Sequence, residues 1–252
     1  MNFVLYNALD KVRRYYNFTR LEARNLIITI LVLGFIVGFN DGTTDSSFVY
    51  WITNMFNSIL IVALAVLVHE STHRIIALIG GYRAEYRVWW YGLMFGLILT
   101  IVSRGKIWFL IPGGFIVDVL QRHRLGHFRY GINYWIVGMV AFMGALSNLL
   151  LAMSFKILMY IQYFQGNPLL EKVVLVNVIY AIMSLLPLPG LGGINLLYAS
   201  RITYVSLYPA LIAAGLLTLY AGVFIAVISF ILVAALAWVI FYFTYEGDSY
   251  AE

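Results

Sequence analysis

The chain has 252 residues, of which 63% are hydrophobic and only 11% are charged, and its mean hydropathy is +0.89. These values exclude an ordinary soluble domain and indicate a polytopic membrane protein. Because the chain has no cysteine, disulfides, thiolate metal sites and a cysteine nucleophile are also excluded. The net charge of +5 comes from bases scattered beside apolar segments, where they set membrane orientation, so we expect no nucleic-acid partner.

The first 25 residues are charged and aromatic and lack the apolar core of a signal peptide. We expect them to form an interfacial segment, followed by one membrane domain over 26–245 and a short polar tail over 246–252. Seven apolar segments follow in chain order: 26–39, 48–80, 88–102, 107–117, 133–164, 173–188 and 207–245. The last segment is long enough for a pair of helices with a break near Gly222.

The sequence predicts an all-α polytopic membrane protein with a small membrane-associated β hairpin or sheet and about six transmembrane helices. The segment 85–142 is the hardest to arrange as simple spans. If 88–102 crossed fully, Arg104 and Lys106 would lie outside the cell, so we expect a dipping hairpin or a small sheet on the cytoplasmic side. The stretch IPGGFIVD suits a strand edge better than a helix interior.

The loop charges predict the orientation of the chain in the cell membrane. Five bases precede the first span: Lys11, Arg13, Arg14, Arg20 and Arg24. The stretch DGTTDSS after that span is acidic without a base, so we expect a cytoplasmic N-terminus and an external 41–47 segment. The span that starts at Phe48 then runs inward, and Arg74, Arg83 and Arg87 are expected to meet the cytoplasm.

The motif HESTH lies near the inner end of that span. His69 and His73 are four residues apart, so they share one helix face and can coordinate one metal ion. Glu70 is rotated towards the neighbouring face of the helix. In HExxH metalloproteases the two imidazoles hold zinc and the carboxylate takes a proton from water. The sequence therefore predicts His69 and His73 as zinc ligands and Glu70 as the base. The alternative is a polar trio satisfied by neighbours, but ionisable groups in spans are costly and usually functional.

Two later stretches resemble the site-2 protease family of intramembrane zinc metalloproteases. The first is GMVAFMGALSNLLLA, which resembles the Gly-x-x-x-Asn segment of that family, with Gly144 and Asn148 at the matching positions. The family usually has proline after that glycine, whereas this chain has Ala145. The resemblance implies a substrate-binding role, in which Asn148 holds an extended substrate strand or polarises its carbonyl. The alternative for Asn148 is an amide that packs helices together.

The second stretch is SLLPLPGLGGINLLYASR, which is similar to the family's Asn-x-x-Pro-x-Pro-x-x-Asp-Gly turn. Four positions fall in register: Pro187, Pro189, Leu191 and Gly193. The resemblance implies that the two prolines shape a substrate-binding turn. However, Gly192 stands where the family has its third zinc ligand, and Ser184 stands where it has asparagine. The resemblance covers about 18–201, with a protease-like core over about 48–201, and is that of an archaeal-type member.

The missing aspartate leaves the zinc shell incomplete, because catalytic zinc generally takes three protein ligands and a water. Four residues are candidate substitutes, although none matches a family ligand position: Asp118, Asn195, His123 and His127. The last two are also four apart, but they lie in an arginine-rich loop without an embedded acid. An interfacial or phosphate-facing role fits that histidine pair better.

The expected function is hydrolysis of a peptide bond in or near a substrate's transmembrane segment, with Zn²⁺ as cofactor and with a transmembrane protein and the lipid bilayer as partners. The sequence predicts neither the substrate nor an oligomeric state. One alternative is a protease-like protein that binds transmembrane helices without turnover, as Gly192 favours. Another is a transporter with a proton relay, which lacks the expected paired repeats.

Overall fold

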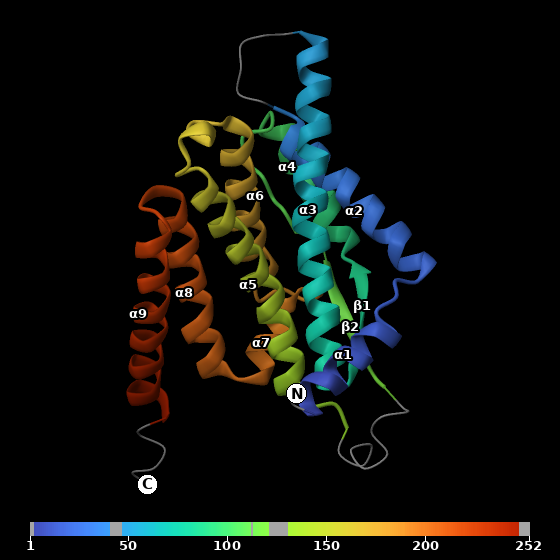
Figure 1. Cartoon of the computed structure of the whole chain (residues 1–252), viewed down its shortest axis with the longest axis vertical. Helices are drawn as coiled ribbons and strands as arrows, with labels where there is room; N and C mark the ends of the chain where they lie inside the picture. Colours follow the sequence, from blue (N-terminus) through green and yellow to red (C-terminus); the bar gives the residue numbers. More distant parts are fainter. Residues whose placement is uncertain (1–2, 41–46, 112, 121–130, 247–252) are drawn as a thin grey trace.

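The computed structural model describes residues 3–40, 47–111, 113–120 and 131–246. The described chain is mostly helical with one two-stranded sheet (Figure 1). Five helical segments are long and apolar enough to cross a membrane: α2 (Arg20–Gly38), α3 (Phe48–Gly80), α5 (Tyr134–Leu158), α8 (Arg201–Tyr220) and Val223–Thr244, which contains α9 (Val223–Phe241). The predicted class, a helical multi-pass membrane protein with a small sheet, is confirmed.

The remaining elements are shorter: α1 (Phe3–Tyr15), β1 (Tyr82–Val88), α4 (Trp90–Val102), β2 (Gly113–Val119), the 3₁₀ turn η3 (Gln162–Phe164), α6 (Pro168–Ser184), α7 (Gly192–Ala199) and the π-helical turn η4 (Tyr242–Glu246). At 17 residues, α6 is shorter than the five candidate spans. It nevertheless packs beside α5 and α3 in the interior of the bundle.

Helix ends follow local sequence signals. At the start of α2 the Thr19 side chain accepts from the Glu22 N–H, and the Glu22 carboxylate accepts from the Thr19 N–H, which forms a capping box. At the end of α3, Gly81 has φ 83°, and its N–H bonds to the carbonyls of the last helical turn. The first signal fixes the start of α2, and the second fixes the end of α3, the helix with the HESTH motif.

The long helix α3 has 33 residues and runs the length of the molecule, between α2 on one side and α5 and α6 on the other (Figure 1). Helices α8 and α9 lie outermost beside α5. One hydrophobic cluster joins α2, α3 and α6, and a second joins α5 to α8. The HESTH motif therefore lies where the two clusters meet.

The strands β1 and β2 are antiparallel, with Tyr82 opposite Val119 and Val88 opposite Gly113. They do not form a simple hairpin, because α4 lies between them and packs against α2. The Asn40 side-chain amide, just beyond α2, donates to the Arg104 carbonyl at 2.9 Å. The expectation that Arg104 and Lys106 stay at the same end as β1 is therefore wrong: an apolar helix of 13 residues carries the chain to the far end of α2 before it returns.

Candidate metal centre

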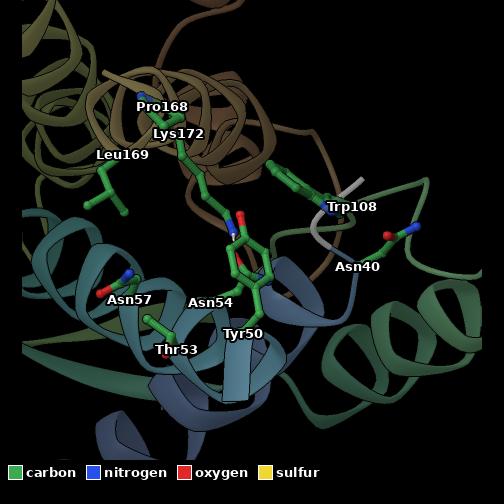
Figure 2. Close-up of a pocket in the computed structure, with 9 residues that line it drawn as sticks. All are labelled: Asn40, Tyr50, Thr53, Asn54, Asn57, Trp108, Pro168, Leu169 and Lys172. Atoms are coloured by element: carbon green, nitrogen blue, oxygen red, sulfur yellow. Dashed lines mark hydrogen bonds between the residues drawn. The ribbon is translucent and has the colours of Figure 1, made fainter. Parts of the chain in front are cut away.

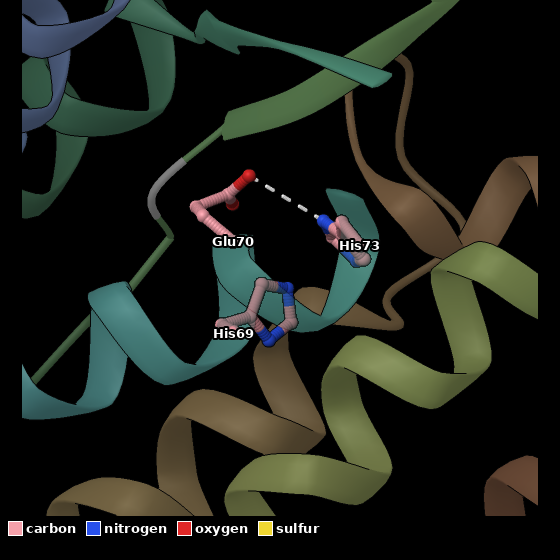
Figure 3. A group of neighbouring side chains, drawn as sticks. All are labelled: His69, Glu70 and His73. Carbon is pink, nitrogen blue, oxygen red and sulfur yellow. Dashed lines mark ion pairs between the residues drawn. The ribbon is translucent and has the colours of Figure 1, made fainter. Parts of the chain in front are cut away.

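The residues His69, Glu70 and His73 form a buried cluster on α3 (Figure 3). Each side chain is at most 4% exposed, and the two imidazole centroids are 4.3 Å apart. One ligand atom from each residue lies within 4.8 Å of the other two. The helix thus gathers two imidazole nitrogens and a carboxylate oxygen in a volume that fits one cation.

Several polar atoms of this cluster have no hydrogen-bond partner among the described residues: His69 Nδ1, Glu70 Oε1, and both ring nitrogens of His73. The nearest charged contact is 3.5 Å, between Glu70 Oε2 and His73 Nδ1. Buried polar groups are normally paired, and an ion or water explains such a group of exceptions. Imidazole nitrogen and carboxylate oxygen are also donors that zinc accepts, so the residues fit a zinc ion.

The neighbouring helix α5 covers the two imidazoles with Gly144. A Cβ at Gly144 would lie 2.2 Å from His73 Nε2 and 3.1 Å from His69 Cε1. Only a residue without a side chain therefore fits beside the histidines. On the other side, the ring of Phe115 on β2 lies 4.5 Å from the His73 ring. The cluster is enclosed by α3, α5 and the sheet.

We expect Gly144→Ala to weaken zinc binding, because the new methyl group would displace the His73 imidazole. Gly138→Ala is the matched control on the same helix, since its Cβ would meet Ala199 at 2.5 Å and not the imidazoles. Zinc affinity, measured by competition with a chromophoric chelator, should fall about tenfold or more for the first variant only. Equal affinities in both variants would contradict the position of the imidazoles.

Asn148 also comes close to the cluster. Its side chain is fully buried and contacts the His69 imidazole, and its Nδ2 donates to the Ala65 carbonyl at 3.3 Å. Because Ala65 lies one turn before His69, the amide joins α5 to α3 beside the first candidate ligand. This placement suits both the packing role and the substrate-binding role.

The turn between α6 and α7 packs against both α5 and the start of β2, because Gly192 faces Ala141 and Gly190 faces Gly114. A Cβ at Gly192 would lie 3.1 Å from the Ala141 side chain, one turn before Gly144. Pro187 and Pro189 are exposed at the surface of the turn. The position of the family's aspartate therefore faces α5 near the histidines, whereas the two prolines do not join the cluster.

The candidate substitute ligands are not gathered at this cluster. Asp118 is exposed on β2, opposite Arg83. Asn195 lines a separate cavity of about 260 Å³, together with Gly114 and Gly190. His123 and His127 lie outside the described residues. Within the described ranges, no further histidine or acid joins the three motif residues.

Sequence reasoning missed the buried ion pair that follows the motif. The Arg74 guanidinium bonds to the Glu22 carboxylate and to the Asn17 carbonyl, and it lies 4.0 Å from the Phe18 ring centroid. Glu22 also accepts from the Tyr86 N–H at 3.1 Å. The expectation that Arg74 meets the cytoplasm is wrong, because this pairing leaves it only 2% exposed.

A larger pocket of about 310 Å³ lies at the opposite end of α3 and contains none of the motif residues (Figure 2). The Lys172 ammonium donates there to Asn54 Oδ1 at 2.7 Å and to Ser58 Oγ at 2.8 Å. Those bonds join the start of α6 to α3. The chemistry of the buried cluster is therefore independent of this pocket.

The fold and the site define a multi-pass membrane protein with a buried His-Glu-His group on a membrane-length helix. The chain is 28% identical, over 184 residues, to a protein of Methanocaldococcus jannaschii named "Putative zinc metalloprotease". The match covers 71% of this chain and 84% of that relative. No family model matches the chain, and no solved structure matches it.

Proposed function

We propose that the chain is a membrane-embedded zinc metalloprotease of the site-2 protease type, which hydrolyses a peptide bond in or near a transmembrane segment of its substrate. The observation that carries the proposal is the buried group of His69, Glu70 and His73 on a membrane-length helix. Similarity to an archaeal protein named as a zinc metalloprotease supports the same reaction class.

In this proposal His69 and His73 hold the ion. When bound, zinc polarises the scissile carbonyl and makes water more acidic. Glu70 takes a proton from the attacking water and then delivers it to the leaving nitrogen. The substrate backbone must be unwound locally, because a helix engages its carbonyls in its own hydrogen bonds. Gly144 leaves room for the imidazoles, and Asn148 fixes α5 beside them.

A binding-only protein is the second candidate, because Gly192 supplies no third ligand. Such a protein would capture transmembrane helices without cleaving them. The two candidates differ in turnover, because only the protease cleaves its substrate. They also differ in zinc occupancy if two imidazoles and Glu70 are too few ligands to hold the ion. Both place the chain in the cell membrane with a transmembrane protein as partner.

The test uses the full chain in lipid vesicles with a membrane-spanning peptide substrate. Zinc is measured by mass spectrometry of the metal, and fragments are identified by peptide mass. One zinc per chain and a cut within the spanning segment, lost on chelation and restored by zinc, would support the protease. Stoichiometric zinc without cleavage favours the binding-only protein. Absence of zinc at any loading would remove the protease proposal.

The proposed orientation, with the N-terminus in the cytoplasm, predicts which single engineered cysteines a membrane-impermeant thiol reagent reaches. The chain has no native cysteine, so each engineered one reports alone. Ser47→Cys and Lys106→Cys should label from outside the cell, because Arg104 lies against Asn40 at that end. Arg87→Cys should label only after the cells are opened. Labelling of Arg87→Cys in intact cells would contradict this orientation and indicate the opposite one.

A further inference from the structure

Helix α6 brings one more polar group to the buried cluster. The ring of Tyr180 meets the His69 imidazole edge to face, with centroids 5.1 Å apart and an interplanar angle of 79°. Tyr180 is 1% exposed, and its hydroxyl has no hydrogen-bond partner among the described residues. In the described part of the chain, it is the one fully buried side-chain hydroxyl without a hydrogen-bond partner.

A phenylalanine would give the same ring packing without burying an unpaired hydroxyl, which costs free energy when nothing pairs with it. A buried hydroxyl without a partner is explained when its hydrogen-bond partner is bound only in the working site. The hydroxyl is near enough to the Glu70 carboxylate and to Tyr86 for electrostatic interaction. The phenol therefore packs on the His69 ring and interacts electrostatically with the residue that would handle the proton.

The amide of Asn148, a second donor beside His69, is already engaged. The Asn148 Nδ2 donates to the Ala65 carbonyl, and the same side chain contacts His69. Its amide is therefore used to hold α5 to α3. The Tyr180 hydroxyl, by contrast, keeps its proton available.

We propose that Tyr180 is a catalytic hydrogen-bond donor, whose hydroxyl binds the carbonyl oxygen of the scissile peptide as negative charge builds there. This inference rests on the proposed peptidase function. The water oxygen bonds to the carbonyl carbon, its proton goes to Glu70, and the C=O electron pair moves onto the oxygen that Tyr180 binds. Collapse of this tetrahedral adduct breaks the C–N bond, and Glu70 returns the proton to the departing amine.

The test compares Tyr180→Phe with Tyr82→Phe. Tyr82 is also buried, but its hydroxyl accepts from the Asn133 N–H at 2.9 Å, away from the cluster. For Tyr180→Phe we expect kcat to fall about 100-fold, with KM and zinc content unchanged and a thermal midpoint equal or higher. For Tyr82→Phe we expect an unchanged kcat and a lower midpoint. Unchanged kcat in Tyr180→Phe, or loss of zinc from it, would overturn the assignment.

Binding of a peptide phosphonate, which mimics the tetrahedral adduct, separates this inference from the proposed function. Tyr180→Phe should bind the phosphonate about 100-fold more weakly than the wild type and bind the uncleaved peptide equally well. If the wild type holds zinc and cleaves nothing, the proposed function fails, and the phosphonate comparison alone decides the role of Tyr180. Equal phosphonate affinity, or a wild type that never binds zinc, overturns the assignment.

Discussion

Glu70→Gln should reduce peptide hydrolysis by about 10² to 10⁴-fold while zinc stays bound, because glutamine has the size of glutamate but cannot accept the proton of the attacking water. Glu70 is 4% exposed, and its Oε1 has no partner among the described residues, so the replacement removes little structural bonding. The two imidazoles remain to hold the ion. Cleavage is followed by peptide mass and zinc by metal analysis on the same preparations.

The control is Glu85→Gln, which changes a partly exposed carboxylate on β1 that pairs with Arg83 at 3.4 Å. Its effect on hydrolysis should be small, because exposed ion pairs contribute little. An undiminished rate in Glu70→Gln would exclude Glu70 as the base. Loss of zinc from Glu70→Gln would instead identify its carboxylate as a ligand.

Gly192→Asp should tighten zinc binding by about tenfold or more and raise peptidase activity, because it restores a carboxylate at the position where the resembled family has its third ligand. The geometry allows this change. A Cβ at Gly192 would lie 3.1 Å from the Ala141 side chain, so α5 needs to shift by only a few tenths of an ångström. Zinc affinity is measured by chelator competition and activity on the same membrane-spanning peptide.

The adjacent glycine provides the contrast. A Cβ at Gly193 would lie 2.1 Å from the Leu185 carbonyl oxygen, which is backbone and cannot rotate away. Gly193→Asp should therefore fail to fold, which would be seen as loss of the cooperative thermal transition. If Gly192→Asp changes neither zinc nor activity in a wild type that already has both, another residue completes the shell. Substitutions at Asp118, Asn195, His123 and His127 would then identify it by loss of zinc.

The parts of the site that local spacing determines were predictable from the sequence. The i, i+4 relation of His69 and His73 requires only a helix, and the apolar run around them made that helix evident. The assignment of Gly144 and Asn148 to the site was predicted from the resemblance in motif order. Their proximity to the imidazoles, however, depends on how α5 packs against α3.

The parts that depend on pairing between distant segments were not predictable. Tyr180 lies 111 positions after His69, and nothing in the local pattern of α6 distinguishes it from other buried aromatics. Arg74 looked like a loop base because its partner, Glu22, is 52 residues away and already had a capping role. The path of α4 was missed because loop charges constrain orientation but not how far an apolar helix reaches.

The buried pair of Arg74 and Glu22 bears on how the protein enters the membrane. Each residue is at most 3% exposed, and removing the partner of a buried charge typically costs about 3 to 5 kcal/mol. During synthesis α2 emerges first, with its carboxylate unmatched until α3 has followed. The paired α2–α3 hairpin is therefore more stable in the membrane than either helix alone. The completion of that hairpin also fixes α3, the helix with the HESTH motif, before α5 and the sheet, which enclose the motif, have been synthesised.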